Sequence, residues 1–261
     1  KVIVGQDQVI EQLLRAMFCN GHCILEGVPG LAKTLLISTL ARQLSLSFSR
    51  IQFTPDLMPS DITGTEVIEE DRGTGTRSLR FVKGPVFANV VLADEINRTP
   101  PKTQAALLEA MQEHQVTAAG FPHKLPRPFF VFATQNPIEL EGTFPLPEAQ
   151  IDRFFIKLKL GYPTEEEENE ILLRFERDEP LEHLQAVVNA ESILEMQRVV
   201  RTVRVEASVR EYVIAIVRAT RAHQSVELGS SPRGSLYLYH AAQAYAALHG
   251  RDYVLPDDVK Y

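Results

Sequence analysis

The stretch Gly27-Val28-Pro29-Gly30-Leu31-Ala32-Lys33-Thr34 decides the fold because of what lies on either side of it. The apolar residues Cys23-Ile24-Leu25 before it predict a short buried strand, and Leu35 to Ala41 after it have apolar residues at helical spacing. A glycine-rich turn between a strand and a helix points backbone N–H groups at a phosphate chain, and the helix adds the positive end of its dipole. The sequence therefore predicts a nucleotide site in this turn.

Two side chains of this turn carry the expected chemistry. Lys33 would reach the β- and γ-phosphates, and the Thr34 hydroxyl would bind a Mg²⁺ that bridges them. The turn matches the P-loop, or Walker A, pattern except that Ala32 replaces its last glycine, which removes conformational freedom at that position. The alternative is a plain glycine-rich turn that binds nothing.

The composition is that of an ordinary soluble globular protein. The 261 residues are 44% hydrophobic and 23% charged, enough for one large or two ordinary domains. The net charge of −7 does not indicate a nucleic-acid-binding protein, although it does not exclude a local basic groove. Without an apolar run of membrane-spanning length or a signal-peptide pattern, we expect a cytoplasmic protein, in which Cys19 and Cys23 are buried free thiols.

A second apolar run, Val90 to Ala93, ends in the two acids Asp94 and Glu95. A central parallel strand delivers such acids to the carboxyl edge of its sheet. Asp94 would hold the Mg²⁺ opposite Thr34, either directly or as an outer-sphere ligand, and Glu95 would orient and deprotonate the attacking water. Paired acids at a strand end can also be plain surface residues. The phosphate loop upstream favours the catalytic interpretation.

Three further segments complete a predicted set of five strands: Phe48–Phe53, Phe129–Ala133 and Phe155–Leu160. The second of these is followed by Thr134-Gln135-Asn136-Pro137. Asn136 is the best candidate there for a side chain beside the γ-phosphate, because Pro137 constrains the exit of the chain. The alternative is that Asn136 only caps a turn.

Two β-hairpins are predicted between these strands. Thr65–Ile68 and Leu79–Val82 flank the turn-rich stretch Asp71–Gly75, and Gln115–Thr117 precedes His123–Leu125 across a short connection.

From Thr164 onward the pattern is helical, so we expect two domains: a nucleotide-binding core over residues 1–161 and a separate helical domain over residues 162–261. Ser231-Pro232-Arg233 has the form of a helix start. Three pairs have the spacing of a capping box, namely Thr164 with Glu167, Ser192 with Glu195, and Ser208 with Glu211.

Taken together, these motifs resemble those of the MoxR family of AAA+ ATPases. The resemblance implies an α/β P-loop NTPase core with a five-stranded parallel sheet, followed by a small all-α lid. It spans nearly the whole chain and is carried by Leu31-Ala32-Lys33-Thr34, Leu92 to Arg98, Ala133 to Pro137, Glu141 to Gln150, Asp152-Arg153-Phe154 and Ser231-Pro232-Arg233.

The resemblance also implies roles for individual residues. Val4-Gly5-Gln6 would lie near the adenine, Asn136 would be sensor 1, and Arg233 would be sensor 2 on the lid. Arg153 would be the arginine finger that enters the site of a neighbouring subunit, with Arg98 as the alternative finger. The bound ligands would be ATP and Mg²⁺.

Two insertions and an assembly follow from the same resemblance. The hairpin at about residues 62–83 would be the helix-2 insert, and that at about residues 115–125 the pre-sensor-1 hairpin. Proteins of this group form rings, commonly hexamers, and act as chaperone-like factors on partner proteins, often ones with a von Willebrand factor A domain. No membrane span is expected.

Two other functions remain open from the sequence. One is a nucleic-acid motor of the same clade, which the acidic net charge and the weakly basic His123-Lys124 disfavour. The other is a nucleotide-gated scaffold with little hydrolysis, against which the presence of Glu95, Asn136 and Arg153 argues.

Overall fold

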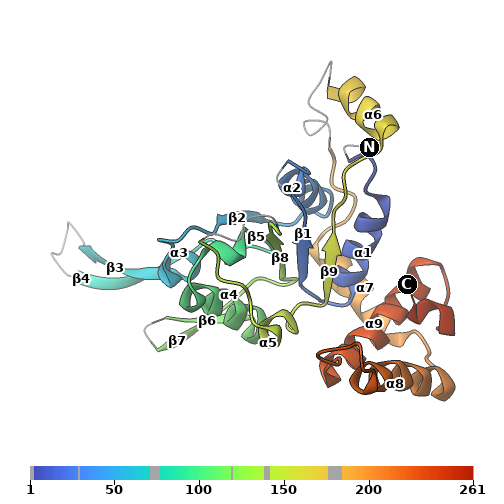
Figure 1. The fold of residues 1–261 in the computed structure, drawn as a ribbon. Coiled ribbons are helices and arrows are strands. Elements are labelled where there is room, and N and C mark those ends of the chain that lie inside the picture. The colour runs from blue at the N-terminus through green and yellow to red at the C-terminus, as the bar shows by residue number, and fades with distance from the viewer. Residues whose placement is uncertain are drawn as a thin grey trace.

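The computed structural model describes residues 3–28, 30–70, 77–118, 120–137, 142–175 and 184–260 (Figure 1). Pro29 of the predicted phosphate loop, Glu141, and the predicted hairpin tip Asp71–Gly75 lie outside the described residues.

Five parallel strands form the central sheet, which confirms the predicted fold class. The strands are β1 (Cys23–Glu26), β2 (Phe48–Gln52), β5 (Val90–Asp94), β8 (Phe130–Gln135) and β9 (Ile156–Lys159). Their order is β2-β5-β8-β1-β9, and each neighbouring pair is parallel. All five carboxyl ends therefore lie along one edge of the sheet.

The two central strands, β5 and β8, are buried on both faces. Val91 and Ala93 belong to one apolar cluster, whereas Val90 and Leu92 belong to another, as the two-residue period of a strand requires. Helices α3 (Pro59–Thr63) and α4 (Pro101–Glu113) contribute to the first cluster. Helices α1 (Asp7–Phe18) and α2 (Lys33–Gln43) contribute to the second. The sheet is thus the middle layer of three.

Both predicted hairpins are present. One joins β3 (Gly64–Glu70) to β4 (Arg77–Lys83) and projects away from the sheet in Figure 1. The other joins β6 (Gln115–Ala118) to β7 (Phe121–Lys124). The ring of Phe81 on β4 stacks on that of His123 on β7, with their centres 4.1 Å apart. The two hairpins therefore contact each other through this ring pair.

The remaining elements are short helices and the C-terminal helices. They are η1 (Ile96–Arg98), α5 (Glu148–Ile151), α6 (Glu165–Phe175), α7 (Ala190–Thr202), α8 (Ala207–Ala222), α9 (Pro232–Leu248) and η2 (Pro256–Val259).

The helices after residue 162 do not pack as one bundle. In Figure 1, α6 lies at the end of the molecule that holds the N-terminus, away from α8 and α9. Helix α7 contributes Ile193 to the apolar cluster of α1 and α2, and the Val187 N–H donates to the Gln43 carbonyl at 2.7 Å. The packing that is separate from the sheet is that of α8, α9 and η2 around Val213, Ala246 and Val259.

The capping predictions are confirmed at two helices and wrong at two others. Thr164 and Glu167 form the predicted reciprocal hydrogen bonds, at 2.8 and 3.3 Å. Ser231 caps α9 by accepting from the Gly234 N–H at 3.2 Å. By contrast, Asn189 caps α7 and Glu206 stands before α8, so Ser192 and Ser208 lie inside their helices. The capping-box spacing gave the wrong helix start at both sites because each helix begins earlier in the chain, directly after Asn189 and after Glu206.

Both cysteines are buried free thiols, as predicted. Burial raises the pKa of both Cys19 and Cys23, so they remain neutral at physiological pH. Among the described residues, no helix combines the length and apolarity needed to cross a membrane.

The end of the helical domain depends on an ion pair between Arg251 and Asp258. The guanidinium donates to both carboxylate oxygens, at 2.6 and 2.7 Å, and the Asp258 side chain is only 2% exposed. Burial acts to raise the pKa of Asp258, but the hydrogen bonds from Arg251 and the Leu255 N–H outweigh it, and the pKa is lowered. The charged carboxylate is therefore the form that stabilises the fold.

We expect Arg251→Met to lower the free energy of unfolding by about 2 kcal/mol at neutral pH, because it leaves a buried carboxylate without its cation. The pair contributes fully above the ordinary pKa of 3.8 and is lost as pH falls below it, so the difference from the parent protein should shrink in acid. Denaturant unfolding at pH 7 and at a pH well below 3.8, where the folded-state carboxyl also becomes protonated, measures both effects.

Lys260→Met is the matched control. It removes the exposed ion pair of Lys260 with Asp257, in which both side chains are more than half exposed, and should change stability little. Equal losses in the two variants would show that burial of Asp258 does not decide the effect.

Candidate functional site

The predicted site residues meet where three neighbouring strands end. β1 leads into Gly27, β5 ends at Asp94, and β8 leads into Asn136. The strands lie side by side in register, and the Gly27 N–H donates to the Gln135 carbonyl at 3.3 Å. The structure thus brings the phosphate loop, both acids and Asn136 together at the carboxyl edge of the sheet.

Lys33 begins α2 and turns back over the loop. Its Nζ donates to the Gly27 carbonyl at 2.7 Å. Partial burial lowers the pKa of Lys33, while the negative charges of Asp94 and Glu95 act in the opposite direction. This electrostatic coupling places the lysine and both acids in one site, and Thr34 follows in the first turn of α2.

Asp94 is held through both of its carboxylate oxygens. Oδ1 accepts from the Thr134 hydroxyl at 2.6 Å, and Oδ2 accepts from Nη2 and Nε of Arg50 at 2.5 and 3.1 Å. The Thr134 oxygen also accepts from the Glu95 N–H at 2.8 Å, and Thr134 is fully buried. Thr134 therefore orients both acids at once.

Glu95 has left-handed backbone dihedrals, with φ 57°, which turn its side chain out of the strand. Its Oε2 accepts from Gln52 Nε2 at 3.0 Å and pairs with Arg98 Nε at 2.9 Å. Arg98, the alternative arginine finger, is thus paired with the acid of its own chain.

Sequence reasoning did not single out Arg50 and Gln52. Both lie on β2, two residues apart, so they share the face of that strand opposite the buried Ile51. Two polar side chains on one face near the carboxyl end of a predicted strand were the signal that could have found them.

A small apolar cavity of about 170 Å³ lies beside the phosphate loop. Val4 and Gln6, two of the three residues predicted to lie near the adenine, line this cavity, while Gly5 lies in the adjoining pocket beside Glu167. The rest of the lining joins the loop and α2 to the segment before and along α6: Ile3, Gly30, Leu31, Ala32, Leu35, Leu36, Pro163 and Ile171. Pro163 and Ile171 were not predicted. Helix α6 thus contributes to the wall of this cavity through Ile171.

Arg153 and Arg233 lie at the opposite edge of the sheet. They line one pocket of about 260 Å³ together with His22, which directly precedes β1. Arg153 precedes β9, whose first residue pairs with the first residue of β1. The strands therefore separate both arginines from the phosphate loop of the same chain.

Contacts across the domain boundary hold this arginine edge. Arg233 Nη1 lies 3.6 Å from an Asp152 carboxylate oxygen and 3.3 Å from the Asp152 carbonyl. The Ser231 hydroxyl donates to Asp152 Oδ1 at 2.6 Å, and Tyr237 donates to the Arg153 carbonyl at 3.2 Å. These bonds tie the start of α9 to the segment that carries Arg153.

The donor set fits Mg²⁺ bound together with phosphates. Thr34 and Asp94 offer hard oxygen ligands, and Mg²⁺ in phosphate-binding sites takes one or two protein carboxylates plus substrate oxygens. Within the described ranges, no group of three or more His, Cys, Asp or Glu side chains could hold a metal without such a substrate.

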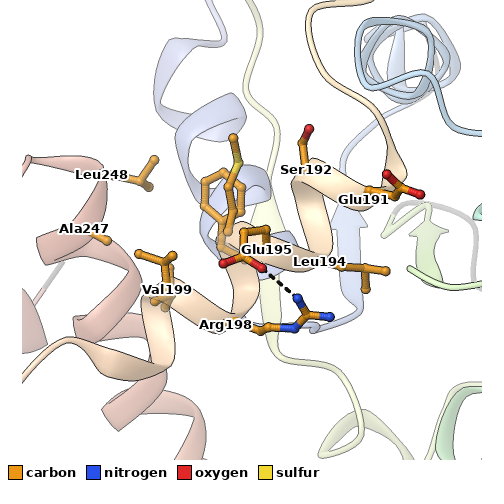
Figure 2. A pocket seen from close by; sticks show the side chains of 11 residues that line it. Glu191, Ser192, Leu194, Glu195, Arg198, Val199, Ala247 and Leu248 are labelled. Atoms are coloured by element: carbon orange, nitrogen blue, oxygen red, sulfur yellow. Dashed lines mark hydrogen bonds and ion pairs between the residues drawn. The ribbon is translucent and has the colours of Figure 1, made fainter.

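A wide groove elsewhere takes no part in this site. This groove of about 1030 Å³ is lined by α7, by Phe18 at the end of α1 and by Leu248 at the end of α9. Figure 2 shows Leu248 and side chains of α7 that line it. Glu195 and Arg198 form an ion pair on its rim at 2.7 Å. None of the predicted site residues lines it.

Ala32 has a left-handed backbone, with φ 52°, at the N-cap of α2. An L-residue with a Cβ is strained there, whereas glycine is not. We expect Ala32→Gly to raise the free energy of unfolding by about 1 kcal/mol. Ala105→Gly, the same change on the exposed side of α4, should lower it by a similar amount. Thermal unfolding of both variants measures whether each change stabilises or destabilises the protein. A loss of stability in both variants would show that the backbone at Ala32 is not strained.

Comparisons with known proteins agree with this geometry. The profile of the ATPase family associated with various cellular activities (AAA) matches residues 22–156, and that of the AAA lid domain matches residues 218–261. YeaC of Bacillus subtilis is 51% identical over all of this chain and 80% of its own length. Chaperone MoxR1 of Mycobacterium tuberculosis is 46% identical over 99% of this chain and 70% of its own.

A solved structure extends the likeness to three dimensions. A Cytophaga hutchinsonii protein described as a candidate ATPase superposes with a TM-score of 0.89 at 45% identity, covering 99% of this chain and 80% of its own. With the five-stranded parallel sheet, the phosphate loop and the two acids at one edge, the chain belongs to the MoxR family of AAA+ ATPases.

Proposed function

We propose that this chain is a Mg²⁺-dependent ATPase whose sites are completed between the subunits of a ring, commonly a hexamer in its group. The supporting observation is the division of its charged residues. Lys33, Asp94 and Glu95 lie at one edge of the sheet, and Arg153 and Arg233 at the other. In a single chain, the edge with the phosphate loop thus lacks these arginines, and the edge with the arginines lacks the phosphate loop.

At the nucleotide edge, the chain's own residues have distinct tasks. Lys33 and the backbone N–H groups of the loop bind the phosphates, and Val4 and Gln6 lie where the adenine would pack. Asn136, buried beside the acids, would contact the γ-phosphate. When bound, Mg²⁺ would neutralise charge between the β- and γ-phosphates.

Hydrolysis would follow from the orientation of Glu95. Its carboxylate accepts a proton from the water that attacks the γ-phosphorus, the bond to the bridging oxygen breaks, and ADP leaves with that electron pair. Arg153 and Arg233 of an adjacent copy would stabilise the charge that develops on the phosphoryl group. Asp152 pairs with Arg233, and both arginines line one pocket, so the two cations would reach the adjacent copy together.

The output would be a change in a partner protein. Relative MoxR1 is named a chaperone. We propose a chaperone-like remodelling role here, on a partner of the kind this family serves, such as one with a von Willebrand factor A domain. The β3–β4 hairpin, with Ile68 and Leu79 about 70% exposed, is a surface that such a partner could contact.

Turnover per subunit should rise with protein concentration, because one chain lacks part of its site. Glu95→Gln should abolish turnover while it keeps nucleotide binding, and Lys33→Ala should abolish nucleotide binding. Phosphate release and binding of a fluorescent ATP analogue measure the two properties. Turnover independent of concentration would contradict the shared site, and turnover retained in Glu95→Gln would contradict the proposed base.

Mixing two inactive variants tests which chain supplies the arginine. Arg153→Ala alone should lose about 10³-fold or more in turnover. Mixed in equal amounts with Lys33→Ala, it should recover about one quarter of the parental turnover, because that fraction of interfaces in a closed ring joins an intact phosphate loop to an intact arginine.

Lys33→Ala mixed with Glu95→Gln is the matched control. Both changes damage the same edge, so no interface in that mixture is intact and no turnover should return. If instead Arg153→Ala keeps its turnover, while Arg98→Ala loses turnover alone and recovers it when mixed with Lys33→Ala, the finger is Arg98.

A further inference from the structure

Arg50 lies on the edge strand β2, directly beside β5, which ends at Asp94 and leads into Glu95. In the parallel pairing of β2 with β5, Arg50 is opposite Leu92 and Gln52 is opposite Asp94. Ile51 is buried in the core, so its neighbours Arg50 and Gln52 project from the other face. Arg50 reaches forward along the strand direction to the carboxylate of Asp94.

The contact between the two side chains uses one oxygen of Asp94. Both Nη2 and Nε of Arg50 donate to Oδ2, at 2.5 and 3.1 Å, while Thr134 occupies Oδ1. The Asp94 side chain is 13% exposed, and a carboxylate at that depth requires a positive partner. Arg50 supplies this charge from within the chain.

Asp94 also offers an oxygen ligand to the Mg²⁺ that the proposed function requires, and this inference rests on that function. A guanidinium on Oδ2 and a divalent cation at the same oxygen would repel each other strongly. The guanidinium must therefore leave the carboxylate when the metal binds. Arg50 can do so because its side chain is 49% exposed and its long stem can swing towards solvent.

We propose that Arg50 is a positioning residue that competes with the divalent cation for Asp94. It holds the carboxylate in place and balances its charge when no metal is bound, and it weakens the binding of a bare metal ion. A metal that arrives with the phosphates of a nucleotide gains their oxygens as additional ligands and displaces the guanidinium. Occupancy of Asp94 by metal is thereby made to depend on nucleotide.

The test measures metal binding directly with Mn²⁺ as the probe. Electron paramagnetic resonance gives the Mn²⁺ dissociation constant with and without saturating ADP. We expect Arg50→Gln to tighten Mn²⁺ binding about fivefold, the modest factor that suits a half-exposed ion pair. This increase in Mn²⁺ affinity should be larger without ADP, because the guanidinium competes most effectively when the metal has no phosphate ligands. Arg50→Lys keeps the positive charge but has fewer hydrogen-bond donors, so its Mn²⁺ affinity should lie between that of the parent protein and that of Arg50→Gln.

Two controls accompany this measurement. Arg80→Gln removes the exposed ion pair with Glu69 on the β3–β4 hairpin, far from the site in sequence, and should leave Mn²⁺ binding unchanged. Asp94→Asn should weaken it strongly. If Asp94→Asn has no effect, the metal assignment of the proposed function fails, and the role of Arg50 fails with it. If Asp94→Asn weakens binding but Arg50→Gln leaves it equal or weaker, only the role of Arg50 is overturned.

Thermal unfolding in EDTA provides a second readout. In EDTA, Arg50→Gln should melt at a lower temperature than the parent protein, because Asp94 loses its cation. Without the chelator, Mn²⁺ together with ADP should raise the melting temperature of Arg50→Gln by more than it raises that of the parent protein. An equal or smaller increase in the variant would contradict the proposal.

Discussion

The parallel alignment of β1, β5 and β8 is the constraint on which the site depends. β8 lies between the other two strands, so Thr134 on β8 is adjacent to Leu25 of β1 and follows Ala133, the partner of Ala93 on β5. From there its hydroxyl donates to Asp94 and accepts from the Glu95 N–H. A slip of one residue in either pairing would turn the hydroxyl to the other face of the sheet and release both acids.

The charges at the two edges of the sheet are balanced in different ways. At the carboxyl edge, Asp94 and Glu95 have cationic partners from their own chain, Arg50 and Arg98. At the amino edge, Arg153 has no ion pair within the described part of the chain, and Arg233 is paired loosely with Asp152 at 3.6 Å. The amino edge therefore carries the positive charge that its own chain balances least, which suits the proposed head-to-tail contact between copies.

A short path of packed elements joins the acids to the β6–β7 hairpin. η1 follows Glu95 directly, and α4 leads from there to β6. The buried Gln104 amide on α4 donates to the carbonyls of Ile96, Thr99 and Phe144, at 2.9 to 3.1 Å. The Phe81–His123 ring pair continues the contact to the β3–β4 hairpin. A displacement at Glu95 therefore has a contiguous route to both projecting hairpins.

The sequence alone determined the local elements and the chemistry they carry. Apolar runs, and the glycine-containing turns between them, predicted all five strands, both hairpins and the loop with Lys33 and Thr34. These elements could be predicted because the side-chain periods of strands and helices are visible within a few consecutive residues. The capping boxes at Ser192 and Ser208 were wrong, since a cap depends on where the chain leaves the extended state, and Asn189 and Glu206 came first.

Only the tertiary structure decided which side chains meet across strands. The ion pair of Arg50 with Asp94 joins residues 44 positions apart and depends on the register of β2 with β5. The placement of Arg153 and Arg233 away from Lys33 depends on which end of β1 the helical domain packs against. Local periodicity determines the face of an element on which a residue lies, whereas strand order and domain packing determine what lies opposite that face.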